Sequence, residues 1–190
     1  MKALIAKGIF LASLFLFFSC DNFYFNFNYT GTSGSSGTKE SNQILCPRYI
    51  KEKVVDFAYQ YADADTFYEW GGQDPLRAIG IDCSGLVVRC YSYATSGTGY
   101  SLIQSDMSSA YMYESATSQT TTPEAGDLVF MGEVNSSAIT HVGIFVKKLG
   151  TEIYFIDSTD SGSTNGVSER SYDISNKKIK GYGIMKLKQK

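Results

Sequence analysis

The sequence predicts an α+β fold, because helical and strand-like patterns occupy different parts of its globular region. Apolar residues between positions 47 and 63 recur at helical spacing, and the run CSGLVVRCYSY (83–93) has the character of a second, mostly apolar helix. After Pro123 the pattern changes to short β-rich runs bounded by Gly and polar residues. Helices followed by strands predict helices packed on an antiparallel sheet.

The N-terminus has the pattern of an export signal. Lys2 and Lys7 precede a short apolar run, IFLASLFLFF (9–18), which falls well below the roughly 20 residues needed to span a bilayer. Ser19 before Cys20 is similar to a bacterial lipoprotein cleavage site, where the cysteine is lipidated and becomes the first residue. An ordinary signal peptide and an uncleaved anchor are the alternatives. We therefore expect a protein exported and lipid-anchored to the bacterial cell envelope, on its periplasmic or outer face.

We divide the chain into three parts. Residues 1–19 are a lipoprotein-type signal peptide, residues 20–43 are the lipidated cysteine and a flexible Gly/Ser-containing tether, and residues 44–190 form one globular domain. The apolar content of 43% is enough for a core in that domain. The net charge of −2 gives no basic footprint for nucleic acid.

Three helices are expected in the first half of the domain. Pro47 suits the first turn of a helix over 47–63, Asp82 stands where an N-cap of the second helix would be, and a third helix is expected around 102–115. We interpret the apolar stripe of the first helix as core: Tyr49, Val54, Phe57, Ala58 and Tyr61.

Four runs after Pro123 are expected to be strands: 128–131, 140–146, 152–158 and 182–187. The polar segment STDSGSTNG (158–166) is either a lid or specificity loop or a plain surface excursion.

The remaining cysteines and the single histidine limit the possible chemistry. Without a CxxC pair and with one His there are too few ligands for a zinc site, so no metal or cofactor is expected. Cys46 and Cys90 either form a disulfide in an oxidising compartment or are two small buried thiols.

Cys83, His141 and Asp157 are the candidate catalytic residues. A thiol at the start of a helix faces unpaired N–H groups and the positive end of the helix dipole, and both stabilise a thiolate. An imidazole paired with a thiol activates the sulfur, and a polar residue behind the imidazole orients it. If strands 140–146 and 152–158 form a hairpin in which paired numbers sum to about 298, Asp157 lies opposite His141.

Four motifs resemble the NlpC-type cell-wall cysteine peptidase family. They are YEWGG (68–72), DCSGLV (82–87), GDLVF (126–130) and THVGIF (140–145), in the order in which the family has them. The resemblance covers roughly residues 46–187. It implies a papain-like fold in which the nucleophile helix packs on the antiparallel sheet. It also implies hydrolysis of amide bonds in peptidoglycan stem peptides, commonly between D-glutamate and a diamino acid.

The resemblance assigns roles by position. Cys83 matches the nucleophile, His141 the base and Asp157 the variable third position that orients the base. Tyr68 matches a tyrosine whose hydroxyl lies near the thiol and helps to bind the oxyanion; its alternative is a core aromatic.

The resemblance also bears on the residues around the nucleophile. Asp82 and Ser84 match positions that bind the free amine of a stem peptide, although Asp82 is equally a plain helix cap. We interpret Asp127 as structural, and Trp70 with its two glycines as part of the cleft wall.

The sequence thus predicts a monomeric envelope endopeptidase whose substrate is a peptidoglycan stem peptide. Two alternatives stay open: another thiol amidase or acyltransferase on the same fold, and a non-catalytic envelope binding module.

Overall fold

The computed structural model describes residues 42–190 except 65 and 77–79, so the predicted signal peptide, Cys20 and almost all of the tether lie outside the described residues. Its fold is α+β, as predicted. Eight strands form an antiparallel sheet: β1 (Gln43–Leu45), β4 (Tyr100–Leu102), β5 (Thr117–Thr120), β6 (Leu128–Met131), β7 (His141–Leu149), β8 (Glu152–Ser161), β9 (Thr164–Asp173) and β10 (Ile179–Gln189). Among the helices of the described part, none is long and apolar enough to cross a membrane.

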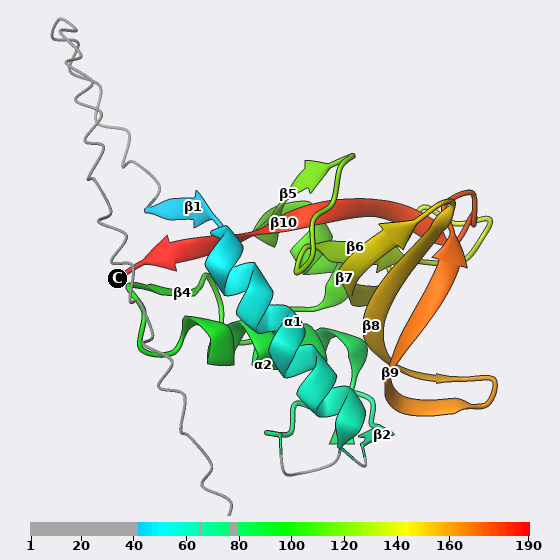
Figure 1. Cartoon of the computed structure of the whole chain (residues 1–190), viewed down its shortest axis with the longest axis horizontal. Coiled ribbons are helices and arrows are strands. Elements are labelled where there is room, and N and C mark those ends of the chain that lie inside the picture. The colour runs from blue at the N-terminus through cyan, green and yellow to red at the C-terminus, as the bar shows by residue number, and fades with distance from the viewer. Residues whose placement is uncertain (1–41, 65, 77–79) are drawn as a thin grey trace, which may run out of the picture. The chain divides into compact units, whose positions relative to one another are not determined.

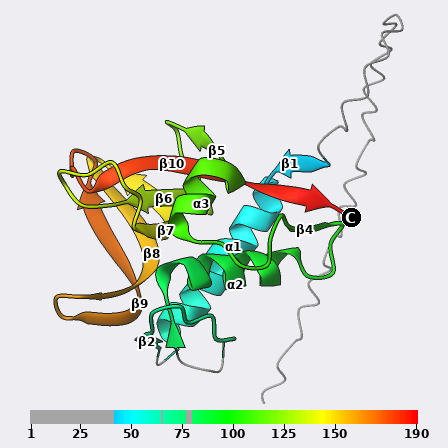
Figure 2. The ribbon, with the colours of Figure 1, turned by 180° about the vertical axis from the view of Figure 1, so that it is seen from behind.

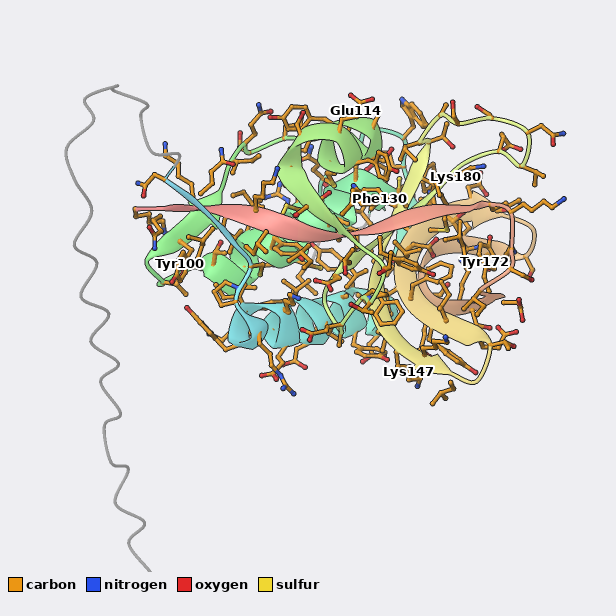
Figure 3. The ribbon with its side chains drawn as sticks, turned by 90° about the horizontal axis from the view of Figure 1, so that it is seen from above. Tyr100, Glu114, Phe130, Lys147, Tyr172 and Lys180 are labelled. Atoms are coloured by element: carbon orange, nitrogen blue, oxygen red, sulfur yellow. The ribbon has the colours of Figure 1, made fainter. Side chains whose placement is uncertain are left out.

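The order of strands in the sheet is β1-β10-β6-β7-β8-β9, and β10 also pairs with β4 and β5. Figure 3 shows β10 running along the whole molecule, from the end near Tyr100 to the end that carries Lys180. The sequence predicted β6, β7, β8 and β10, although β7, β8 and β10 are longer than their apolar runs.

Two long helices pack on each other and on strands β7 to β9 (Figure 1). Helix α1 (Arg48–Asp63) buries Ile50, Val54, Ala58 and Tyr61 on the face toward α2 (Cys83–Thr95), which is buried along most of its length. The prediction was wrong for Tyr49, which is 48% exposed, because the buried stripe begins one residue later.

The third predicted helix is right only in its second half. Leu102, the first residue of the predicted run, belongs to β4 and pairs with Leu187 of β10, and residues 103–108 have no regular structure. The helical part is confined to α3 (Ser109–Tyr111) and a π-helical turn, η1 (Met112–Ala116), and the Ser108 hydroxyl accepts the Tyr111 N–H at its start. Figure 2, seen from behind, shows α3 in front of the sheet, and the turn η1 that follows it contacts β10. The helix therefore begins seven residues later than predicted, after the end of β4 and a short irregular segment.

The segment 158–166 is not a loop but the turn end of a long hairpin, β8 with β9. Ser158–Ser161 end β8, Gly162 and Ser163 make the turn, and Thr164 begins β9. Strand β9 was not predicted because its residues, TNGVSERSYD (164–173), are mostly polar and do not alternate between apolar and polar. A polar strand is possible here because β9 is the outer edge of the sheet.

A short parallel pair completes the fold next to the start of α2. Strand β2 (Phe67–Tyr68) pairs with β3 (Gly80–Ile81), which leads directly into Asp82. Ile81 is fully buried, so β3 anchors the helix start in the core. The pairing brings Tyr68 next to the beginning of α2.

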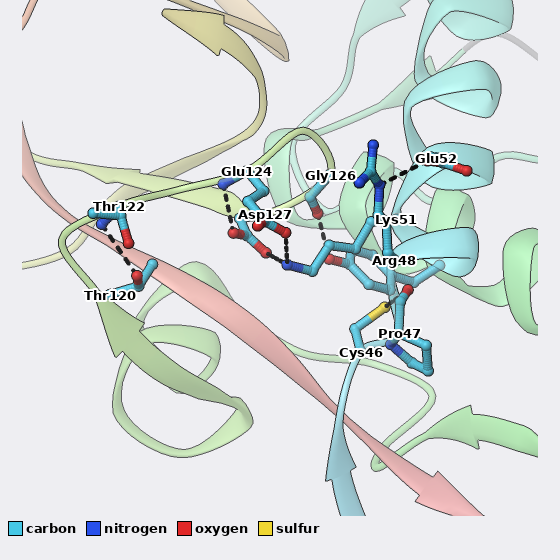
Figure 4. Close-up of polar contacts among 11 residues, drawn as sticks. Cys46, Pro47, Arg48, Lys51, Glu52, Thr120, Thr122, Glu124, Gly126 and Asp127 are labelled. Carbon is cyan, nitrogen blue, oxygen red and sulfur yellow. Dashed lines mark hydrogen bonds and ion pairs between the residues drawn. The ribbon is translucent and has the colours of Figure 1, made fainter. Parts of the chain in front are cut away.

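Asp127 has the structural position that the sequence suggested. Its side chain is fully buried, where it accepts the Glu124 N–H at 2.8 Å and pairs with Lys51 Nζ at 2.7 Å (Figure 4). Lys51 also lies 3.4 Å from the Glu124 carboxylate. These contacts fasten the turn before β6 to helix α1.

Candidate active site

The nucleophile candidate Cys83 is the first residue of α2 and is 7% exposed. Asp82 caps the helix, and its Oδ1 accepts the Gly85 N–H at 2.6 Å and the Ser84 hydroxyl at 2.9 Å. This confirms the predicted N-cap. The cap fixes the first turn, so the sulfur lies at the end of the helix where the dipole favours negative charge.

The Trp-Gly-Gly segment packs against this helix start. Asp82 Oδ2 accepts the Gly71 N–H at 3.0 Å, and the Asp82 N–H donates to the Gly72 carbonyl at 3.0 Å. A Cβ at Gly85 would lie 2.1 Å from that carbonyl oxygen, so only glycine allows the segment to approach so closely. Trp70 projects away from these contacts and is 86% exposed.

His141 and Asp157 lie in contact on neighbouring strands, with His141 Nε2 at 2.6 Å from Asp157 Oδ2. The assumed register was wrong by two residues, since Ile144 pairs with Ile156 and Phe145 with Phe155. A shift of two residues keeps every side chain on its own face of the sheet. His141 and Asp157 are therefore diagonal neighbours rather than directly opposite, and they still meet.

The structure also brings His141 to the thiol of Cys83. Burial opposes a charge on the ring, but hydrogen bonds to Asp157 and to Cys83, with the negative charges of both, raise the pKa of His141 to about 9. Because Nε2 is taken by Asp157, Nδ1 is left for the sulfur. The site thus favours an imidazolium beside the sulfur at neutral pH.

Tyr68 lies near the thiol, next to the start of α2. Burial, followed by the negative charges of Cys83, Asp82 and Asp160, raises the pKa of its phenol. The hydroxyl therefore stays protonated at neutral pH and is able to donate a hydrogen bond. The Tyr68 backbone N–H donates to Asn165 Oδ1 at 2.7 Å, so the hairpin predicted as a loop holds this residue in place.

Sequence reasoning missed two residues that surround the candidate triad. Ser158, next to Asp157, donates its buried hydroxyl to the Ile81 carbonyl at 2.6 Å, which ties β8 to the segment before Cys83. Arg170 of β9 donates from Nε to Asp157 Oδ1 at 2.9 Å and from Nη2 to Asp157 Oδ2. A turn at Gly162 would have been the signal for this hairpin. In its register Asp157 lies opposite Ser168, and Arg170 follows Ser168 by two residues, within reach of Asp157.

A cavity of about 160 Å³ opens beside the imidazole. Its polar lining includes Glu133, His141, Thr159, Arg170, Tyr172 and Lys178. The described residues contain no cluster of His, Cys, Asp and Glu that could hold a metal ion.

The other two described cysteines differ from Cys83. Cys46 and Cys90 are buried free thiols, so the disulfide alternative is wrong. Burial raises the pKa of Cys46 to about 12, with Lys51 lowering it and Asp127 raising it, and burial alone raises that of Cys90. Neither thiol has the histidine that contacts Cys83.

The profile of the NlpC/P60 family matches residues 65–182, and the chain belongs to this family. It is 41% identical over 112 residues to the bifunctional muramidase/DL-endopeptidase CwlT of Bacillus subtilis (strain 168), which covers 58% of this chain and 30% of CwlT.

Solved structures agree with this assignment. An NLP/P60 family protein described as similar to lipoprotein, from Staphylococcus aureus subsp. aureus Mu50, matches with a TM-score of 0.50 and 25% identity. The match covers 78% of this chain and 45% of that protein. The crystal structure of Ly7917 shares the fold at 12% identity, with a TM-score of 0.50 over 71% of this chain and 62% of its own. The chain therefore spans less than half of CwlT and of the staphylococcal protein.

Proposed function

We propose that this protein is a cysteine endopeptidase that hydrolyses amide bonds in peptidoglycan stem peptides, between D-glutamate and a diamino acid. The observation that carries the proposal is the contact of a helix-capped thiol, Cys83, with a histidine that Asp157 holds from behind. Membership of the NlpC/P60 family and the similarity to a protein named a DL-endopeptidase support the substrate class.

In the proposed acylation step, the Cys83 thiolate attacks the stem-peptide carbonyl. The first backbone N–H groups of a helix have no partner within the helix, so that of Cys83 is available to the oxyanion together with the Tyr68 hydroxyl. As the tetrahedral intermediate collapses, His141 gives its proton to the leaving amine. A thioester and a free amine result.

In the proposed deacylation step, neutral His141 takes a proton from a water molecule that attacks the thioester. The carbon–sulfur bond breaks, the carboxylic acid leaves, and the proton on His141 restores the ion pair with the thiolate. Asp157 orients the ring in both steps through its 2.6 Å contact with Nε2.

Asp82 and Ser84 are proposed to bind the free amine of the stem peptide. Asp82 already accepts three hydrogen bonds, from Gly85, Ser84 and Gly71, all from neutral donors. A carboxylate has about four acceptor positions, so one position and the negative charge remain for an ammonium group. Capping the helix and binding the amine are therefore compatible.

We further propose that the protein is exported, lipidated at Cys20 and anchored in the cell envelope as a monomer. The signal-like run before Cys20 supports the anchor, and the origin of all three catalytic candidates in one chain supports the monomer. Labelling cells with a fatty-acid probe tests the anchor. The wild-type chain is expected to incorporate the label and Cys20→Ala to lose it; equal labelling of both would rule out this attachment site.

The test of the activity is incubation with muropeptides that differ in their diamino acid, followed by mass spectrometry. The wild-type protein is expected to release the D-glutamyl fragment, Cys83→Ala to release none, and Cys46→Ala to match the wild type. Cleavage of a different amide would correct the bond assignment. Failure to cleave any stem peptide while another amide or ester is consumed would favour the alternative thiol hydrolase.

A further inference from the structure

We propose that Arg170 is a positioning residue of the site, which locks Asp157 in the orientation that holds His141. The inference rests on the proposed function for its catalytic meaning, but its geometry stands alone. Arg170 contacts neither the thiol nor the imidazole among the described hydrogen bonds, and acts through the carboxylate between them.

The contact between Arg170 and Asp157 is bidentate. Arg170 Nε donates to Asp157 Oδ1 at 2.9 Å, and Nη2 donates to Oδ2, the oxygen that also meets His141 Nε2. Paired N–H donors of a guanidinium match the two oxygens of a carboxylate, so this contact fixes the plane of the carboxylate as well as its position.

Asp157 needs such a partner because its side chain is fully buried. A buried carboxylate is costly unless it is paired and its acceptor positions are filled. His141 reaches one of its oxygens, and Arg170 reaches both. Removing Arg170 leaves Oδ1 without its donor and allows the carboxylate to turn away from the imidazole.

Arg170 is itself held in place. Its guanidinium lies 5.5 Å from the centre of the Phe155 ring and 5.7 Å from that of Tyr172, within the range of cation–π attraction. Its side chain is 20% exposed and borders the cavity beside His141. Rings from two strands therefore confine the arginine, which in turn confines Asp157.

Two explanations of Arg170 predict opposite shifts of the His141 pKa. If Arg170 positions Asp157, its loss weakens the hydrogen bond that raises this pKa, and the pKa falls. If Arg170 acts only as a positive charge near the ring, its loss removes a repulsion and the pKa rises. The charged and titratable groups that face this pair or line the adjoining cavity are Cys83, Glu133, Asp157, Tyr172 and Lys178.

The first experiment titrates His141 by NMR, which is unambiguous because the chain has a single histidine. The reference protein and the Arg170 variant both carry Cys83→Ala, so the sulfur does not contribute to the His141 pKa and no activity is needed. Adding Arg170→Met is expected to lower the His141 pKa by about one unit. The control is Arg48→Met, at an exposed arginine paired with Glu52, which is expected to change nothing. An unchanged or higher pKa in Arg170→Met would overturn the proposal.

The second experiment is a double-mutant cycle on muropeptide cleavage with Arg170→Met and Asp157→Ala. Arg170→Met alone is expected to lower kcat on the order of 10- to 100-fold and to leave KM unchanged. The loss of residues that orient metal-binding histidines in other proteins has effects of this size. In Asp157→Ala it is expected to cause no further loss. Losses that multiply would show that Arg170 does not act through Asp157.

Arg170→Lys takes the place of Arg170→Met if the latter does not fold. Lysine keeps the charge but not the bidentate contact, so it is expected to fall between the wild type and Arg170→Met. If Arg170→Lys had the same kcat and the same His141 pKa as the wild type, the proposal would be contradicted. If no protein cleaves muropeptides, the proposed function fails, while the NMR result still decides the role of Arg170.

Discussion

Two groups in the described part of the protein each combine a thiol with a basic side chain and an aspartate, and we propose a catalytic role for one of them. Cys46, Lys51 and Asp127 form one group at the start of α1 (Figure 4), and Cys83, His141 and Asp157 form the other. Each combines a thiol, a basic side chain and a fully buried aspartate.

The difference lies in what surrounds the sulfur. Cys46 precedes Pro47, outside helix α1, and burial raises its pKa to about 12 even though Lys51 is near. Cys83 begins α2 and lies close enough to His141 to help raise the pKa of the imidazole to about 9. Lys51 pairs with Asp127 and connects helix α1 to the turn before β6. His141 pairs with Asp157 and is able to exchange protons.

The largest effect is expected from His141→Ala. Loss of the proton-transferring group should lower kcat/KM by about 10²- to 10⁴-fold, measured by muropeptide cleavage. Asp157→Ala should cost less, because it removes orientation but not the proton carrier. Equal losses in the two variants would show that this ranking is wrong.

Lys51→Met should be the corresponding change in the structural group. It leaves Asp127 buried without its cation, and we expect a loss of about 3–5 kcal/mol in the free energy of unfolding, measured by urea denaturation. The cleavage rate of the folded fraction should not change. Lys51→Met with Asp127→Leu removes both charges and should recover part of the loss; no recovery would mean that the pair is not the cause.

The raised pKa of His141 predicts a pH dependence that the structural group lacks. A ring with a pKa of about 9 stays protonated through neutral pH, so kcat/KM should fall only as the pH rises through about 9. The same shift stabilises the fold fully below about pH 6.5, the ordinary value, and this stabilisation is lost as the pH rises through 9. In Asp157→Ala the alkaline fall in activity should move to lower pH, and an unmoved profile would disprove the link.

Ser158→Ala tests the tie between β8 and the segment before Cys83. The change removes the shorter of two hydrogen bonds to the buried Ile81 carbonyl, which keeps the Glu69 N–H at 3.4 Å, and should cost about 0.5–1.5 kcal/mol of unfolding free energy. Thermal denaturation measures this loss. Arg48→Met, which breaks only an exposed pair, should change stability by less than about 1 kcal/mol and is the reference for a negligible effect.

The sequence predicted those elements whose apolar pattern and local chemistry agree. The structure contains the stripe of α1 except for Tyr49, the Asp82 cap, and the runs that became β6, β7 and β8, all of which follow from local patterns. His141 and Asp157 meet despite the wrong register, because a shift of two residues does not change the face of the sheet.

The strands that the sequence did not predict, β4 and β9, depend on pairing with other strands rather than on an apolar pattern of their own. The segment at Tyr100 is a strand only because β10 returns beside it, some 85 residues later along the chain. Strand β9 and its Arg170 have polar neighbours and owe their place to the hairpin with β8. The apolar pattern of β9 gives no signal for the partner that holds Asp157, and only the turn at Gly162 with the hairpin register locates Arg170.

The central claim is that Cys83 is activated and Cys46 and Cys90 are not, and thiol reactivity tests it most directly. The folded protein would be treated with iodoacetamide at pH 7 and each cysteine peptide quantified by mass spectrometry, with His141→Ala alongside. We expect rapid modification of Cys83 in the wild type, slow modification of Cys83 in His141→Ala, and protection of Cys46 and Cys90 until unfolding. Modification of Cys83 as slow as that of the two buried thiols, or equally fast without His141, would contradict the account.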